Sequence, residues 1–345
     1  MFTIIVFLLV LAVVVLSHEA GHFFTAKAFG VKVNEFGIGY PPRLFAVKKG
    51  ETEYSVNLLP LGGFVKLSGE EDPTAPGSLA SKSHAKRITV LASGAAVNAL
   101  LPIIFFTAAM ILPHDVASGR IEVVEVSPDS PASTAGIVPG DVITRLDGRD
   151  LINNNELGRV IILNLGEAIP MEIVKADGTT QTVSVTPRWN PPEGQGAVGI
   201  RTRTADVVIE ETTVPFFRAI DQGLREAGET MVLFKNSILM MVFGADAQIA
   251  GPVGIAQMTG EVARAGISPL LEFTAFLSLN LAILNLLPIP ALDGGRIAFV
   301  VVEWARRGKR IDPQTEGKIH FIGFVILIGL IIMVTFQDIL RIVGG

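Results

Sequence analysis

Four stretches of this sequence are apolar for about the thickness of a lipid bilayer. Residues 2–24, 88–112 and 319–336 each provide the roughly 20 apolar residues that a membrane-crossing helix needs, and a fourth stretch runs from about 273 to 292. Inside the hydrocarbon layer the backbone has to form its own hydrogen bonds, which a helix does. The sequence therefore predicts a polytopic α-helical membrane protein with four transmembrane helices.

The first stretch differs from a cleaved signal peptide. It lacks a basic segment before its apolar run, it lacks a small-residue cleavage site, and the run continues to residue 24. We expect it to remain as a helix. A further apolar stretch, residues 231–243, is short for a span and contains Lys235, which favours an amphipathic helix at the membrane surface.

Composition supports a membrane protein and excludes other classes. The chain is 49% hydrophobic and 18% charged, and its mean hydropathy is +0.51. The net charge of -5 provides no basic surplus to neutralise phosphates, so a general nucleic-acid binder is excluded. The chain has no cysteine, so any metal ion must be held by His, Asp or Glu.

Basic residues are concentrated in two segments, and short cytoplasmic loops are where such residues accumulate. The segment between the first two spans carries Lys27, Lys32, Arg43, Lys48, Lys49, Lys66, Lys82, Lys86 and Arg87. The segment between the last two spans carries Arg296, Arg306, Arg307, Lys309, Arg310 and Lys318. Both segments are predicted to be cytoplasmic. Both termini and the long middle region are then extracytoplasmic.

These observations divide the chain into eight predicted segments. They are a first span at 1–26, a cytoplasmic loop at 27–87, a second span at 88–112, an extracytoplasmic domain at 113–204, an amphipathic helical linker at 205–272, a third span at 273–295, a cytoplasmic loop at 296–318 and a fourth span at 319–340.

The first span contains the motif H-E-x-x-H as His18, Glu19 and His22. On a helix the two histidines lie on one face and can share a metal ion, with Glu19 beside it as a base. The alternative is a pair of core histidines. Three ionisable groups inside an apolar span each cost roughly 2.5 to 3.5 kcal/mol unless they are satisfied, which favours the metal site.

Catalytic zinc has three protein ligands and an open fourth position, so a third ligand is expected at the same depth. Asp293 follows two helix-breaking prolines near the end of the third span, although an aspartate there could also cap the helix that begins near Gly294. With four spans the first and third run in the same direction, which brings Asp293 level with His18 and His22. An additional span at 231–243 would move it to the opposite side.

The middle region contains a specific string. Residues 121–126 are predicted to form a strand, and the segment from Ser130 to Gly148 reads S-P-A-S-T-A-G-I-V-P-G-D-V-I-T-R-L-D-G. This string resembles the one found in bacterial PDZ domains, and the resemblance covers most of residues 116–200. It implies one PDZ domain with an α+β fold.

The combination of H-E-x-x-H with N-L-L-P-I-P-A-L-D-G-G, from Asn285 to Gly295, resembles the site-2 protease family of intramembrane zinc metalloproteases, in its bacterial form with one PDZ domain. F-G-I-G-Y at 36–40 and L-P-L-G-G-F-V-K at 59–66 support this resemblance. In place of the family's G-P-x-x-N, the second span has G-A-A-V-N at 94–98, without the proline.

The resemblance implies a multi-pass protein of the bacterial cytoplasmic membrane with its active site toward the cytoplasm. It implies that the first loop forms a β-hairpin dipping into the membrane beside the site. Substrates would be single-span membrane proteins, such as anti-sigma factors or signal-peptide remnants, that an upstream site-1-type protease has already cut.

Roles follow for individual residues as expectations. His18, His22 and Asp293 would hold Zn²⁺, and Glu19 would transfer protons during peptide hydrolysis. Asn285 and Asn98 are candidate substrate-binding residues, although an asparagine that bonds a neighbouring helix is the alternative for Asn285.

The substrate helix must unwind before it can be cut, and residues 53–65 are a candidate edge for strand addition, with a plain cytoplasmic hairpin as the alternative. The PDZ domain would capture a new C-terminus or exclude substrates with bulky exported domains.

Two other functions remain open from sequence. A membrane-anchored PDZ scaffold with a decayed catalytic site is opposed by the complete set of four motif residues. An ion or proton transporter is opposed by the single ligand cluster and the lack of inverted halves.

Overall fold

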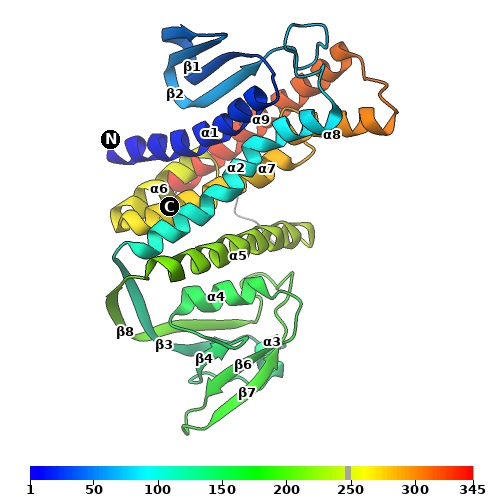
Figure 1. Ribbon diagram of the computed structural model, residues 1–345. Coiled ribbons are helices and arrows are strands. Elements are labelled where there is room, and N and C mark those ends of the chain that lie inside the picture. Colours follow the sequence, from blue (N-terminus) through cyan, green and yellow to red (C-terminus); the bar gives the residue numbers. More distant parts are fainter. Residues whose placement is uncertain (245–249, 345) are drawn as a thin grey trace. The chain divides into compact units, whose positions relative to one another are not determined.

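The computed structural model describes residues 1–244 and 250–344, and the chain forms two compact units (Figure 1). Unit 1 comprises Met1–Ala109 and Ile249–Gly345, and unit 2 comprises Met110–Gln248. Part of the predicted amphipathic linker, residues 245–249, lies outside the described residues. The two units are considered separately below.

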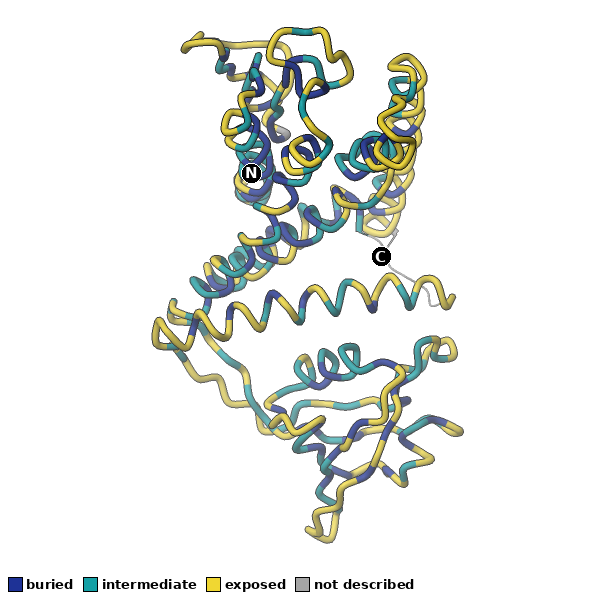
Figure 2. The backbone as a smooth tube through the Cα atoms, turned by 45° about the vertical axis from the view of Figure 1, so that its right-hand side comes forward, coloured by how far each residue is buried: buried dark blue, intermediate teal, exposed yellow. Residues whose placement is uncertain are grey.

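Among the described residues, four helices are long and apolar enough to cross a membrane. They are α1 (Phe2–Ala28), α2 (His84–Ile111), α7 (Ile267–Leu286) and α9 (Pro313–Gly344). Only 11% of the most apolar part of α9 is buried within the protein (Figure 2), as expected for a helix whose neighbours are lipid. The third of these helices begins and ends earlier than the predicted segment 273–295.

Two shorter helices also lie among the described residues of unit 1. They are α6 (Pro252–Ala265), which packs against α1, and α8 (Asp293–Ala305). Glycines allow the close crossings. A Cβ atom at Gly21 would lie 2.5 Å from the Ser93 carbonyl oxygen of α2, and one at Gly260 would lie 2.6 Å from the Thr3 hydroxyl of α1. Backbones that approach this closely favour small residues at helix contacts in membranes.

The loop between α1 and α2 forms an antiparallel sheet from β1 (Val33–Lys49) and β2 (Thr52–Leu67). Both strands fold back on themselves, because Phe36 pairs with Val65 on one side and with Tyr54 on the other. The paired segments therefore lie in the order 43–49, 52–57, 33–40 and 63–67. The prediction that residues 53–65 form one edge is wrong for the first part of that segment, which lies inside the sheet.

Unit 2 contains a six-stranded antiparallel sheet in the order β7-β6-β4-β3-β8, with β5 paired to β4. Its strands are β3 (His114–Val126), β4 (Val142–Leu146), β5 (Arg149–Asp150), β6 (Ile169–Val174), β7 (Thr180–Val185) and β8 (Ile200–Thr212). The short helix α3 (Pro131–Thr134) and the helix α4 (Asn154–Leu163) pack on it. The most deeply buried side chains, which include Ile121, Ile143, Leu146, Met171 and Ile173, form its core.

Helix α5 (Phe216–Val242) occupies the region predicted as an amphipathic linker. It is attached to α4 by ion pairs from Arg159 to Glu226 and Glu229, and by Asn236 Nδ2, which donates to the Ile162 carbonyl oxygen at 2.7 Å. Residues between β8 and α5 return to the end of α2, since the Val214 amide donates to the Met110 carbonyl oxygen at 2.9 Å.

Candidate metal centre

Helix α1 brings two imidazoles together on one of its faces. His18 and His22 are four residues apart, both are buried, and their Nε2 atoms are 3.1 Å apart. This spacing follows from the 3.6-residue turn of an α-helix, which places residues i and i+4 one above the other.

Asp293 reaches the same point from the first residue of α8. Its Oδ2 atom lies 3.0 Å from His18 Nε2 and 3.2 Å from His22 Nε2. The structure thus brings together the three residues that the sequence predicts as metal ligands, across 275 positions of the chain between His18 and Asp293.

The turn that carries Asp293 has little freedom. Helix α7 ends at Leu286, and α8 starts seven residues later, after Pro288 and Pro290. A Cβ atom at Gly294 would collide with the backbone carbonyls of Leu286 and Leu287, and one at Gly295 would collide with the Ile289 carbonyl. Glycine at both positions therefore lets α8 begin directly against the end of α7, which sets the position of Asp293.

A side chain of α9 completes this turn. Ala291 has a positive φ of 80°, and its amide donates to His320 Nδ1 at 2.9 Å. A Cβ atom at Gly323 would lie 2.7 Å from the Pro290 carbonyl oxygen, so α9 packs closely on the same turn. The conformation before Asp293 is therefore stabilised by a helix that provides no ligand.

The tautomer of His22 is determined by its neighbour on α2. Its Nδ1 atom lies 2.8 Å from the Val90 carbonyl oxygen, which can only accept, so Nδ1 carries the proton and donates. In the neutral ring, Nε2 then directs its lone pair toward His18 and Asp293. Metal-binding histidines are oriented by carbonyl partners in this way.

Gly94 of α2 provides the space for both rings. A Cβ atom there would collide with His22 Nε2 and would lie 2.7 Å from His18 Cε1. The candidate metal site is therefore bounded by His18 and His22 of α1, by Gly94 of α2 and by the turn that carries Asp293.

The three donor atoms fit a zinc ion. Zn²⁺ is bound by imidazole nitrogen and carboxylate oxygen at 2.0–2.2 Å, and tetrahedral geometry then puts the ligand atoms about 3.3 Å apart. The separations of 3.0–3.2 Å among His18 Nε2, His22 Nε2 and Asp293 Oδ2 agree with this spacing. Three protein ligands also leave one tetrahedral position for water or substrate.

Glu19 is half-buried and lies beside the cluster on the side of the β1–β2 sheet. A Cβ atom at Gly63 of β2 would be 3.9 Å from Glu19 Cγ. The carboxylate is thus positioned between the metal ligands and the segment 63–67, whose outer edge has no strand partner among the described residues.

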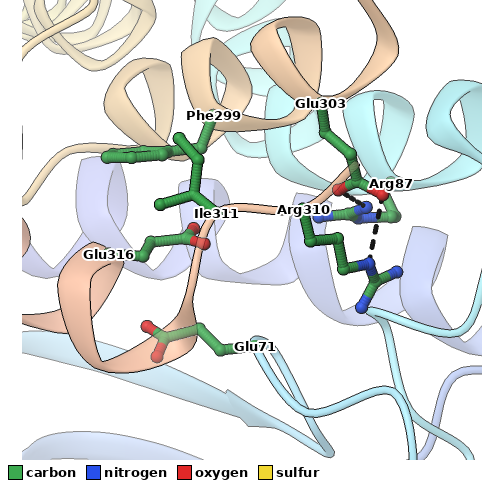
Figure 3. A pocket seen from close by; sticks show the side chains of 7 residues that line it. All are labelled: Glu71, Arg87, Phe299, Glu303, Arg310, Ile311 and Glu316. Carbon is green, nitrogen blue, oxygen red and sulfur yellow. Dashed lines mark hydrogen bonds and ion pairs between the residues drawn. The ribbon is translucent and has the colours of Figure 1, made fainter. Parts of the chain in front are cut away.

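A second buried ionic cluster connects the start of α2 to the end of α8 (Figure 3). Arg87 Nη1 and Glu303 Oε2 are 2.6 Å apart, and both side chains are buried. Arg310 and His84 lie 3.1 and 3.3 Å from the other carboxylate oxygen. The cluster surrounds a cavity of about 10 Å³, the size of one water molecule. It ties α8, which begins with Asp293, to α2, which carries Gly94.

The predicted substrate-binding asparagines lie nearby without joining the ligand cluster. Asn98 is fully buried one helical turn after Gly94, and neither atom of its amide has a hydrogen-bond partner among the described residues. Asn285 is buried in the last turn of α7, and within the described chain no hydrogen bond links it to His18, His22 or Asp293.

Sequence reasoning did not identify Gly94, His320 or the Arg87–Glu303 pair as supports of this site. The signal for Gly94 was present in the string G-A-A-V-N, where glycine is retained in a helix despite its low helix propensity. The other two depend on contacts between segments far apart in the chain.

Comparison with known proteins agrees with these features. The sequence profile described as "Peptidase family M50" matches residues 6–330. A relative from Clostridium perfringens, provisionally named as a zinc metalloprotease, is 38% identical over 343 residues and covers 98% of both chains. A protein of Oceanobacillus iheyensis named zinc metalloprotease RasP is 30% identical over 426 residues, with 99% of both chains covered. A RasP of Geobacillus kaustophilus is also 30% identical, with 98% of this chain and 97% of that one covered. The chain therefore belongs to peptidase family M50, the site-2 protease family of zinc-dependent membrane metalloproteases.

Proposed function

We propose that this protein hydrolyses peptide bonds in the transmembrane segments of single-span membrane proteins, with His18, His22 and Asp293 as zinc ligands and Glu19 as the catalytic base. The observation that carries the proposal is the convergence of the three donor atoms within 4.8 Å of one another, two of them on α1, which is apolar enough to cross a membrane, and the third at the start of α8. Glu19 lies beside them. Membrane spans rarely contain such groups without a functional reason.

The chemistry follows from these positions. Zinc held by His18, His22 and Asp293 would supply a Lewis acid and would lower the pKa of a water molecule toward about 7. Glu19 accepts the proton of the attacking water on its carboxylate and then delivers it to the amide nitrogen of the departing peptide. The Val90 carbonyl holds neutral His22 in the tautomer whose Nε2 can bind the metal, and the turn around Ala291 keeps Asp293 in place.

A helical substrate must expose its scissile bond, and the outer edge of residues 63–67 supports strand addition for this step. An extended peptide paired with that edge would regain the backbone hydrogen bonds that it loses on unwinding. Because Gly63 lies next to Glu19, such a peptide would run past the catalytic carboxylate.

The six-stranded sheet of unit 2 supports a PDZ domain at the predicted position. In the segment that matches the PDZ string, Ser130 caps α3, and Asp141 is buried and accepts from the Val138 amide and from Lys175. We infer that this domain excludes substrates with bulky exported domains. The protease would then act after an upstream site-1-type protease has shortened its substrate, as in regulated intramembrane proteolysis of anti-sigma factors or signal-peptide remnants.

The distribution of basic residues supports an orientation in a bacterial cytoplasmic membrane. Lysines and arginines follow α1 and α8, so these loops would be cytoplasmic, and unit 2 and both termini would be extracytoplasmic. In this arrangement the metal centre lies toward the cytoplasmic side, since His22 is six residues from the end of α1.

An inactive PDZ scaffold is the second candidate, and one experiment separates the two functions. A tagged single-span substrate truncated on its exported side would be co-expressed with the wild-type protein, with Glu19→Gln and with Asp293→Asn. We expect wild type alone to cut, Glu19→Gln to retain zinc without cutting, and Asp293→Asn to lose zinc. Equal cleavage by Glu19→Gln would refute the catalytic assignment, and a zinc-loaded wild type that cuts no truncated substrate in a broad panel would favour the scaffold.

A further inference from the structure

Two hollows follow one another along the second half of α1, on the side where this helix faces the β1–β2 sheet. The first is an almost entirely apolar groove of about 410 Å³. Its helical wall consists of Ala20, Phe23 and Phe24, and its sheet wall includes Phe45 and Val47. These side chains belong to neither the metal centre nor the proposed substrate edge.

The second hollow has about 480 Å³ and is lined by three lysines, Lys27, Lys32 and Lys49, together with one acidic residue, Glu51. None of the three ammonium groups forms a hydrogen bond or ion pair within the described chain. Lys27 Nζ lies 4.6 Å from the centre of the Phe23 ring, which is part of the apolar groove. The basic hollow and the apolar groove therefore meet at this contact.

The α1 side and the β1 side of the two hollows both change from apolar to basic residues where the apolar groove meets the basic hollow. On α1, Lys27 follows Phe23 and Phe24 by one helical turn, in the last turn of the helix. On the sheet, Phe45, Val47 and Lys49 alternate along β1 and so share one face. The helix α1 and the strand β1 thus both present apolar side chains followed by a lysine. This order matches a ligand with an apolar chain and an anionic head.

We propose that these two hollows bind one anionic phospholipid of the surrounding membrane, with an acyl chain in the apolar groove and the phosphate among Lys27, Lys32 and Lys49. The change from apolar to basic residues along α1 favours a phospholipid, because α1 is long and apolar enough to span the bilayer and its last turn carries Lys27. Lysines at such a boundary attract anionic headgroups. A free anion would leave the groove unfilled, and a lipid without net negative charge would leave the positive charge of the three lysines uncompensated.

The site would couple lipid composition to the protease. The groove is formed by the face of the β1–β2 sheet that packs on Phe23, one residue from the ligand His22. A lipid bound between α1 and the sheet would hold the two together, and the segment 63–67 belongs to that sheet. This consequence rests on the proposed role of the edge, whereas lipid binding itself does not.

The test uses the full chain, purified and delipidated in detergent, and follows its thermal unfolding midpoint as lipid is added. The probes are dioleoylphosphatidylglycerol, dioleoylphosphatidylcholine and glycerol 3-phosphate. We expect stabilisation by phosphatidylglycerol and none of similar size by the other two. Lys49→Ala should weaken the apparent affinity for phosphatidylglycerol by about fivefold, since a lysine near an anionic lipid surface contributes about that factor.

Matched controls come from the same strand. Lys48 is adjacent to Lys49 and outside the basic hollow, and Leu44 is as exposed as Phe45, at 63% each, and outside the groove. Lys48→Ala and Leu44→Ser should bind phosphatidylglycerol like wild type, whereas Phe45→Ser should bind it more weakly. Three outcomes would overturn the proposal: equal stabilisation by phosphatidylcholine, equal stabilisation by glycerol 3-phosphate, or equal losses in Lys48→Ala and Lys49→Ala.

Discussion

Gly94 of α2 lies in direct contact with the imidazole of His22, so close that a single added carbon would collide with the Nε2 atom that faces Asp293. The metal centre therefore depends on a residue with no side chain. The contact lies between α1 and α2, so a larger residue at position 94 of α2 would displace the imidazoles of His18 and His22 on α1.

Gly94→Ala should weaken zinc binding by about 10- to 100-fold, the usual effect of disturbing a ligand's immediate support. The measurement is zinc content of the purified protein by metal analysis. Gly158→Ala is the control, because that helical glycine has no atom near its Cβ position. It should retain zinc, and full zinc occupancy in Gly94→Ala would contradict the packing argument.

Asn98→Leu should raise stability by about 1 kcal/mol, because a buried amide without partners is replaced by an apolar group of similar size. If Asn98 contacts the substrate, the same variant should cut about 100-fold more slowly. Thermal unfolding and the cleavage assay report these opposite changes. Asn236→Leu, which removes hydrogen bonds to two carbonyl groups of α4, should lose about 1–3 kcal/mol of stability and serves as the comparison.

Glu303→Gln should destabilise the protein by about 3 kcal/mol, because it leaves the buried Arg87 guanidinium without a counter-charge. Chemical denaturation in detergent would measure this loss. The exposed pair of Glu125 and Arg201 provides a contrast, and Glu125→Gln should change stability by less than about 0.5 kcal/mol. Similar effects of the two substitutions would mean that burial does not distinguish them.

The carboxylate of Glu303 also makes the stability of the protein depend on pH. Burial alone would raise the pKa of Glu303, but the hydrogen bond and charge of Arg87, together with Arg310, hold it below its ordinary value of 4.5. Its contribution to stability is therefore present above pH 4.5 and is lost as the pH falls through the lower, folded-state pKa. Unfolding midpoints measured between about pH 6 and pH 3 should fall less steeply in Glu303→Gln than in wild type.

The four long helices could be predicted from sequence because the bilayer fixes how many apolar residues a span requires. Convergence of His18, His22 and Asp293 was expected from helical periodicity and from the depth of two spans that run in the same direction. The predicted third segment extends to residue 295, whereas α7 ends at Leu286, because Pro288 and Pro290 stop the helix before Asp293 rather than after it.

Contacts between segments that are distant in the chain leave no pattern in the local sequence from which they could be predicted. The double pairing of Phe36 depends on how both strands of the first loop fold back, and alternation of residues along a strand does not report which segment becomes an edge. Contact between His320 and Ala291 joins positions 29 residues apart through helix packing. Such relationships become visible once the helices are packed together.

The contact of α9 with the turn before Asp293 has a consequence for how the enzyme is made. His18, Glu19, His22 and Asp293 are all synthesised before α9, yet the turn that positions Asp293 obtains His320 and the Gly323 packing surface only from that helix. A nascent chain still emerging from the ribosome would thus contain all four of these residues before the turn that orients Asp293 is complete. On the proposed function, proteolytic capacity would begin only with the insertion of α9.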